Sequence, residues 1–278
     1  MTQIISTFIA ALVALGILFS GGCSEDANVD STTEDSGGTD DTVDLTCLGN
    51  DTNIATDAPQ WIQDNFKCVT IYMSGTDIII ETDSVPDHTS PYWGSGDANY
   101  EDMPVGGTQL IPSFVDQNYS FTIPETPTDQ PSPVSMFAGA VAVSVDGVVM
   151  FKGQTSTSSS LSTEASTFDN GNAHPNGGEY IYHYHGEPAK QTDYETSLVG
   201  IMADGYPIYG PLEEDGSTPG TGAYPSLDAQ TYGHTHATND FPSGTFHYHL
   251  YQWDGAVAIG IMPLYFQGLA SPSDVTNL

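Results

Sequence analysis

Two Asp-Gly pairs, each set between apolar runs, constrain the fold more than any other feature of the sequence. They are Asp146-Gly147 in VAVSVDGVVMF and Asp204-Gly205 in VGIMADGYPIY. An Asp-Gly pair in this setting is a strong hairpin signal, because a type I′ turn needs two residues with positive φ. Other short β-rich runs, bounded by Gly, Pro, Asn and Asp, follow from about residue 60 onward, and no long helical pattern interrupts them. The sequence therefore predicts a mainly β fold of antiparallel hairpins.

The two hairpins open two copies of one unit. In each copy the hairpin Asp is followed, at similar intervals, by a second Asp, a His and a His-x-His pair. The members are Asp146, Asp169, His174, His183 and His185 in the first copy, and Asp204, Asp228, His234, His247 and His249 in the second. We therefore expect a duplicated, pseudo-twofold domain with repeats 137–196 and 197–256 and a closing strand at 257–266. Residues 154–167 are expected to form a polar loop.

The His-x-His pairs point to a metal site. Residues i and i+2 of a strand share one face, so each pair presents two imidazoles together, with the tyrosines Tyr180, Tyr182 and Tyr184 on the opposite face of the first strand. Neutral imidazole is the commonest metal ligand and suits Zn and Cu. The candidate metal ligands, with Cu or Zn as cofactor, are His174, His183, His185, His234, His247 and His249.

Two arrangements of these six histidines are open. Each repeat holds its own ion with three imidazoles, or the two His-x-His strands share one site across the pseudo-twofold axis. Asp169 and Asp228 are candidate ligands, or acceptors that fix the imidazole tautomers. Asp204 has the same candidate role, although an Asp-Gly turn needs its Asp for backbone reasons alone. Histidines that pack in the core and bond to tyrosines or carbonyls are the structural alternative. His88 and His236 have no counterparts in the other repeat, and we expect no site role for them.

The first 22 residues are typical of an export signal. The run from Ile4 to Phe19 is nearly all apolar and short for a spanning helix. Small residues then lead to Cys23, an arrangement that resembles a bacterial lipobox, in which the cysteine is lipidated. The absence of Lys and Arg before the apolar run, and Ser20 where Leu is usual, depart from that pattern. Lipidation, plain secretion and a retained anchor are the three alternatives, with an anchored protein of the outer membrane or cell surface expected first.

Residues 23–46 form an acidic, Ser/Thr/Gly-rich segment that lacks aromatics and predicts a disordered flexible linker. A β-rich N-terminal part of the domain is expected at 47–136. In an oxidising compartment, Cys47 and Cys68 are expected to form a disulfide, with free thiols as the alternative.

The chain carries 36 acidic residues against three lysines and no arginine, a formal net charge of −33. Phosphate binding needs basic groups, so we expect no nucleic-acid partner. An acidic surface suits a protein of saline water, and it also attracts cations.

Several of these blocks together resemble the YHYH-domain family, named for the motif present here as Tyr182-His183-Tyr184-His185. The resemblance extends over residues 135–268 and includes FDNGNAHPNGGEYIYHYHGEP, GIMADGYPIYGP, LDAQTYGHTHA and the closing FHYH. We place the YHYH domain at 137–268 and a C-terminal tail at 269–278. The resemblance implies an exported bacterial-type protein with a β-rich domain, and it implies no reaction.

Three functions are compared. The first is an exported metal-binding domain, for metal capture or metal-dependent chemistry. The second is a cell-surface module for carbohydrate or another ligand, with contacts from Trp93, Tyr206, Tyr209 and Trp253 and structural histidines. The third, a Ser-His-Asp hydrolase, is disfavoured because the sequence has no GxSxG elbow. The sequence is compatible with an enzyme and with a binding protein.

Overall fold

The structure, a computed structural model, describes residues 47–252 and 259–278. The predicted fold class is confirmed for these residues, which are mainly β and contain one α-helix, α1 (Gln60–Asn65). No helix within them has the length and apolar character needed to cross a bilayer.

Several expectations fall outside the described residues. They are the signal segment 1–22, the lipidation site Cys23, the linker 23–46 and the aromatic residue Trp253. They stay predictions.

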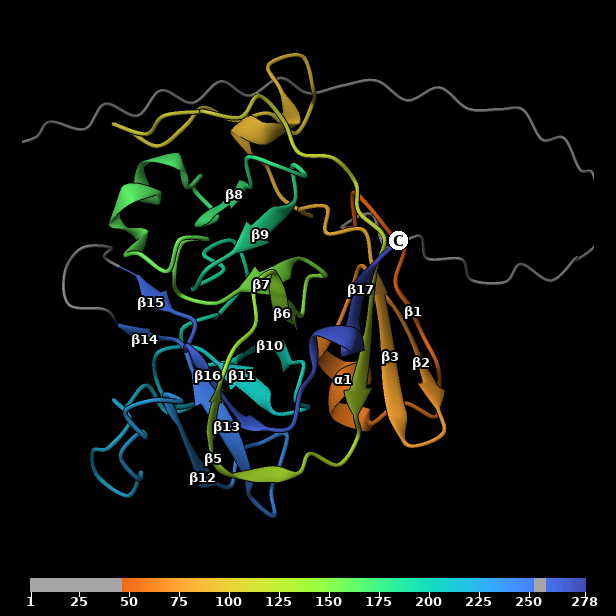
Figure 1. The fold of residues 1–278 in the computed structure, drawn as a ribbon, viewed down its shortest axis with the longest axis vertical. Helices are drawn as coiled ribbons and strands as arrows, with labels where there is room; N and C mark the ends of the chain where they lie inside the picture. The colour runs from red at the N-terminus through yellow and green to blue at the C-terminus, as the bar shows by residue number, and fades with distance from the viewer. Residues whose placement is uncertain (1–46, 253–258) are drawn as a thin grey trace, which may run out of the picture. The chain divides into compact units, whose positions relative to one another are not determined.

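An eight-stranded sheet carries both repeats. Its strands in chain order are β6 (Ala140–Ser144), β7 (Val149–Phe151), β8 (Ala173–Pro175), β9 (Tyr182–Tyr184), β10 (Leu198–Met202), β11 (Pro207–Tyr209), β12 (Gly233–His236) and β13 (Thr245–His249). Across the sheet the order is β12-β13-β11-β10-β6-β7-β9-β8 (Figure 1). At its middle, β6 and β10 pair antiparallel with Val143 opposite Ile201, and from this pair outward both halves repeat the same strand order. The sheet therefore has the pseudo-twofold arrangement predicted from the duplication.

Most strand pairs of this sheet are antiparallel, as predicted, and two pairs are parallel. β9 runs parallel to β7, and β13 runs parallel to β11. In each repeat the chain leaves the first hairpin through a loop and returns as a second antiparallel pair, β8 with β9 or β12 with β13. The second strand of that pair, β9 or β13, pairs with the second strand of the hairpin, β7 or β11. A long loop connects these two strands, and such a connection allows parallel pairing, which a tight turn does not.

The Asp-Gly turns are hairpin turns, as predicted, but not of type I′. Only the glycine has positive φ, 84° at Gly147 and 90° at Gly205. The glycine N–H donates to the carbonyl of Ser144 in the first turn and of Met202 in the second. This is a type I turn followed by a left-handed glycine, the three-residue hairpin loop. Asp146 and Asp204 are thereby buried and free to accept hydrogen bonds from side chains.

A second sheet of five strands packs beside one face of the first, in the order β1-β2-β3-β4-β17 (Figure 1). Its strands are β1 (Asn53–Ile54), β2 (Thr70–Ser74), β3 (Asp77–Thr82), β4 (Tyr119–Pro124) and β17 (Val275–Asn277). Ile71, Ile80 and Phe121 of this sheet share a core with Val143, Val149 and Ile201 of the eight-stranded sheet. The other face of the eight-stranded sheet carries a core with tyrosines from both repeats.

The C-terminal residues are part of the fold and do not form the predicted tail. β17 pairs with β4, with Val275 opposite Phe121. The expected closing strand is divided in two, because Pro263 interrupts it. β15 (Gly260–Ile261) pairs with β14 (Tyr251–Gln252), and β16 (Tyr265–Gly268) pairs with β5 (Asp129–Ser135).

Short 3₁₀ helices occupy several connections. They are η1 (Pro91–Trp93), η2 (Leu161–Thr163), η3 (Ala165–Thr167) and η4 (Pro272–Asp274). The predicted polar loop 154–167 therefore contains η2 and η3, with Glu164 between them. Near the start of the described residues, a disulfide joins Cys47 to Cys68, with their Cα atoms 5.3 Å apart.

The pairing of β6 with β10 leads to a testable prediction about the stability of the core. Ile201 is fully buried on the pseudo-twofold axis, so Ile201→Ala should lower the free energy of unfolding by about 2–5 kcal/mol. Val105→Ala, at an exposed position, should change it by less than about 0.5 kcal/mol. Urea unfolding of the two variants measures both values, and equal effects would contradict this placement of the core.

Candidate metal centres

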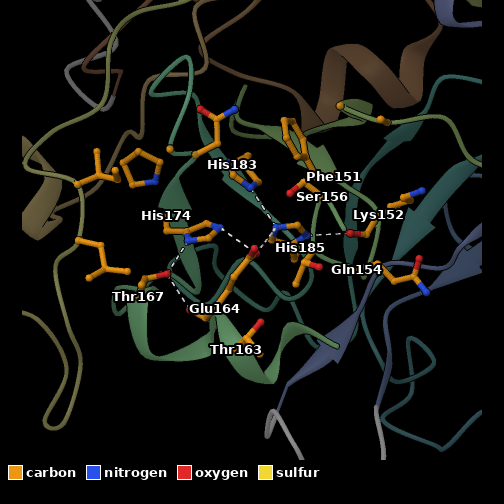
Figure 2. A pocket seen from close by; sticks show the side chains of 18 of the residues that line it. Phe151, Lys152, Gln154, Ser156, Thr163, Glu164, Thr167, His174, His183 and His185 are labelled. Atoms are coloured by element: carbon orange, nitrogen blue, oxygen red, sulfur yellow. Dashed lines mark hydrogen bonds and ion pairs between the residues drawn. The ribbon is translucent and has the colours of Figure 1, made fainter. Parts of the chain in front are cut away.

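Three histidines of the first repeat converge on one point. β8 pairs with β9 so that His174 lies directly opposite His183, and His185 follows two residues later on the same face. The Nε2 atoms of His183 and His185 are 3.0 Å apart. Ligand atoms of all three buried residues lie within 4.8 Å of one another. We call these residues the three-histidine centre, which Figure 2 shows facing a cavity.

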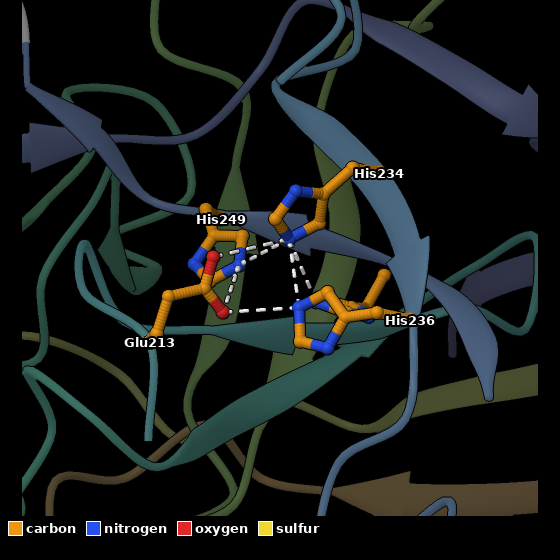
Figure 3. A group of neighbouring side chains, drawn as sticks. Glu213, His234, His236 and His249 are labelled. Atoms are coloured by element: carbon orange, nitrogen blue, oxygen red, sulfur yellow. Dashed lines mark hydrogen bonds and ion pairs between the residues drawn. The ribbon is translucent and has the colours of Figure 1, made fainter. Parts of the chain in front are cut away.

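Four histidines and a glutamate of the second repeat form a second cluster, the Glu213 centre (Figure 3). It consists of Glu213, His234, His236, His247 and His249. The Nε2 atom of His234 is 3.1 Å from the Nε2 atoms of each of the other three histidines. One Glu213 oxygen lies 3.5 Å from His234 Nε2, and the other lies 3.0 Å from His236 Nε2. The histidines are therefore grouped by repeat, and they do not form one shared site across the axis.

The ring orientation of each histidine in the three-histidine centre is fixed by a bond at its other nitrogen. Nδ1–H donates to the carbonyl of Ile181 from His183, at 2.9 Å, and to the carbonyl of Lys152 from His185, at 2.8 Å. His174 Nδ1 lies 2.6 Å from the hydroxyl of Thr167, which itself donates to a carbonyl. That hydroxyl can therefore only accept from His174, so Nδ1 carries the proton in all three rings.

The Glu213 centre follows the same rule. Each Nδ1–H donates to a backbone carbonyl, at distances between 2.7 and 3.2 Å. The acceptors are Pro225 for His234, Ala237 for His236, Thr245 for His247 and Gly210 for His249.

With its proton on Nδ1, each neutral ring has a bare lone pair on Nε2. Lone pairs 3.0–3.1 Å apart with no proton between them repel one another unless a cation lies at their focus. Two ligand atoms bonded to one ion at about 2.0–2.1 Å are themselves about 2.9–3.4 Å apart, which matches this spacing. Two buried atoms, His174 Nε2 and Glu213 Oε1, have no hydrogen-bond partner. Both clusters can therefore hold a metal ion.

Part of the chain is similar to a known protein family. Residues 120–223 match a family model described as YHYH protein. This match confirms the predicted resemblance to the YHYH family over these residues. The match includes the three-histidine centre and Glu213, and it ends before β12, so the other histidines of the second repeat lie beyond it. No curated protein and no solved structure matches the chain.

The aspartates of the YHYH motif region do not orient the imidazoles, contrary to the prediction. Asp169 accepts hydrogen bonds from the hydroxyls of Tyr182 and Ser90, and Asp204 accepts one from Tyr248. Asp228 accepts only from local groups, the backbone N–H of Gln230 and both donors of Thr231. Strand alternation explains the positions of Asp169 and Asp204. The tyrosines that donate to these aspartates lie on the face opposite the histidines, so the aspartates lie on that face too.

The tyrosine face of the YHYH strands is confirmed for Tyr182 and Tyr184, which are fully buried in the second core. Tyr180 was placed there wrongly: it precedes β9, has a φ of 59° and is 42% exposed. Tyr206 and Tyr209 are buried as well, so they form no exposed surface for a carbohydrate.

The sequence analysis did not identify three residues of these sites: His236 and Glu213 in the Glu213 centre, and Glu164 beside the three-histidine centre. The sequence contains a pattern that identifies His236 as a candidate ligand: His234-Thr235-His236, in β12, is the third His-x-His pair of the chain. No such pattern identifies Glu213 or Glu164, because each comes from a loop whose path only the fold determines. His88 stays outside both centres and contacts the hydroxyl of Tyr184.

Burial favours the neutral imidazole at six histidines of the two centres: His174, His183, His185, His234, His247 and His249. It lowers the pKa of His174 to about 3 and that of His185 to about 4, with neighbouring imidazoles adding to the effect at His174. Burial likewise lowers the pKa of His247 to about 2 and that of His249 to about 4. Unfolded histidine titrates near pH 6.5, so between about pH 6.5 and 4 the unfolded chain binds more protons than the folded one.

The metal-free protein should therefore lose stability as pH falls through this window. We compare wild type with His247→Gln/His249→Gln in a chelator, by urea unfolding at pH 7 and pH 5. Wild type should lose about 2–4 kcal/mol more than the variant, since each pKa unit corresponds to about 1.4 kcal/mol. Asp204, whose pKa burial raises to about 6, acts with the opposite sign but equally in both proteins. Parallel pH profiles for the two proteins would show that these histidines are not held neutral.

Proposed function

We propose that this YHYH protein binds transition-metal ions at two histidine centres, one in each repeat. The observation that carries the proposal is the convergence of bare Nε2 lone pairs at 3.0–3.1 Å, with every Nδ1 committed elsewhere. A hydrogen-bonded structural network would put a proton between neighbouring ring nitrogens. Here the carbonyl acceptors hold those protons on the far side of each ring.

Copper and zinc are the proposed ions. Imidazole suits both, and angles close to 90° between ligands, which follow from the 3.0–3.1 Å spacing, are typical of tetragonal N,O sites that bind Cu²⁺. The five donors of the Glu213 centre also exceed the four of a tetrahedral zinc site. We therefore propose Cu²⁺ for the Glu213 centre, and either ion for the three-histidine centre.

The proposed location is the cell envelope, with a lipid anchor at Cys23 in the membrane and the acidic linker as tether. The apolar run before Cys23 supports export, and so does the disulfide between Cys47 and Cys68, because disulfides persist in oxidising compartments. The net charge of −33 favours cations near the protein and disfavours a nucleic-acid partner. Metal capture and metal-dependent chemistry both fit such a protein.

Metal content tests the proposal directly. Wild type, purified without a metal-affinity column and incubated with Cu²⁺ or Zn²⁺, should retain two ions per chain by elemental analysis after gel filtration. His183→Ala/His185→Ala and His234→Ala/His247→Ala/His249→Ala should each retain one. An ion at one hundred times its Kd should raise the free energy of unfolding by about 2.7 kcal/mol per site.

The matched control is His88→Ala, which removes a histidine outside both centres. It should keep both ions and the full stabilisation. A wild type that retains no metal, or variants of the two centres that bind and are stabilised as wild type is, would refute the proposal.

A further inference from the structure

We propose that the two centres have diverged: the three-histidine centre is an open site at which a small exogenous molecule binds the ion, while the Glu213 centre is closed. This inference rests on the proposed metal binding and adds a ligand class to it. Three protein ligands with a free position are the pattern of catalytic metal sites, and a full protein ligand set is the pattern of structural ones. The pseudo-twofold relation between the repeats identifies the residues that make the difference.

Thr155 occupies in the first repeat the place that Glu213 has in the second. Each lies four residues beyond the end of its hairpin strand, β7 or β11. Each N–H donates to the carbonyl four residues later, Ser159 at 3.1 Å and Ser217 at 2.9 Å. The loops are therefore equivalent, and the carboxylate that completes one centre is a short hydroxyl in the other.

Asn176 likewise stands in the place of His236. The register pairs His174 with His183 in one repeat and His234 with His247 in the other, so the residue two positions further along is Asn176 or His236. The Asn176 side chain accepts hydrogen bonds from the N–H groups of Glu179 and Ile181 and is thus committed to its own turn. Both substitutions remove a ligand from the same centre.

A cavity of about 400 Å³ adjoins the centre that lacks these ligands (Figure 2). All three of its histidines line this cavity, as do Thr155 and Asn176, and no residue of the Glu213 centre does. His174 is 7% exposed, and its Nε2 faces the cavity without a hydrogen-bond partner. The volume is within the usual range for small-molecule sites, about 300–1,000 Å³.

Glu164 marks the open side of the centre. It enters from the loop between η2 and η3, with one carboxylate oxygen 3.7 Å from His185 Nε2 and 3.9 Å from His174 Nε2. Its side chain is 31% exposed, whereas that of Glu213 is 2% exposed. Glu164 therefore provides a hydrogen-bond acceptor beside the free coordination position of the ion. It can accept a hydrogen bond from an N–H or O–H group of a bound molecule.

The cavity walls define the ligand class. Tyr92, Leu110, Ile111 and Phe151 supply apolar surface, and Thr155 and Ser156 supply hydroxyls. Glu164 and the strongly acidic chain disfavour anions, and the lysine of the lining, Lys152, has its ammonium bonded to the carbonyl of Met136. We infer a compact, uncharged molecule with an apolar body and one nitrogen or oxygen donor that reaches the ion.

The test uses Co²⁺ as the ion, because its visible absorption reports ligand changes, with imidazole and 4-phenylimidazole as probes. His234→Ala/His247→Ala/His249→Ala retains only the three-histidine centre, and His183→Ala/His185→Ala retains only the Glu213 centre. Both probes should shift the spectrum of the first variant and of wild type. 4-Phenylimidazole should bind about tenfold more tightly than imidazole, because its ring is buried in the cavity.

A reciprocal exchange tests the assigned residues without removing any histidine of the three-histidine centre. Thr155→Glu/Asn176→His should keep its ion and lose the response to both probes at that centre. Glu213→Thr/His236→Asn should keep two ions and gain a response at the second centre. Circular dichroism confirms that each variant is folded before titration.

The outcomes separate the two proposals. Bound Co²⁺ in both centres, with no probe response or with equal responses, would overturn the open and closed assignment and leave metal binding standing. Equal affinity for the two probes would overturn the ligand class. A wild type that binds no Co²⁺ or other ion would overturn both proposals.

Discussion

Every imidazole in the two centres is held by a hydrogen bond from its Nδ1 to a fixed oxygen, and the site depends on these bonds. Most of the acceptors are backbone carbonyls, so the sheet and its loops set the ring orientations directly. The fold therefore directs the Nε2 atoms of the seven histidines toward two points without the help of an ion. Burial lowers the pKa of His174, His183 and His185 in one centre and of His234, His247 and His249 in the other, which favours the neutral form that binds a metal. The same burial makes the metal-free protein sensitive to acid.

Duplication explains why there are two centres, and the loops explain why they differ. The pseudo-twofold pairing of β6 with β10 repeats the strands, and with them the His-x-His pair and its cross-strand partner. The remaining donors come from outside this repeated frame. His236 and Glu213 complete one centre, while Thr155 and Asn176 leave the other facing a cavity. Sequence change at a few loop and strand-end positions thus separates a closed site from an open one on a common scaffold.

Much of the fold was predictable from the alternation of residues along the strands and from the spacing of the repeated motifs. The hairpins, the duplication and the opposition of Tyr182 and Tyr184 to the histidines follow from short-range pattern, which the fold preserves. The roles of Asp169 and Asp204 were not predictable, because hydrogen bonding across the sheet depends on which face each loop returns to. Glu213 and the strand β17 depend on contacts between residues far apart in the chain. Local patterns carry no signal for such contacts.

Anomalous diffraction from crystals of the Cu²⁺- or Zn²⁺-loaded protein tests the central claim most directly. Data collected on both sides of the metal absorption edge locate the ions independently of the protein atoms. We expect two peaks, one in each centre, each about 2.0–2.2 Å from Nε2 atoms, with every Nδ1 still bonded to its carbonyl or hydroxyl. No peak in either centre, or an ion bound through Nδ1, would contradict this expectation.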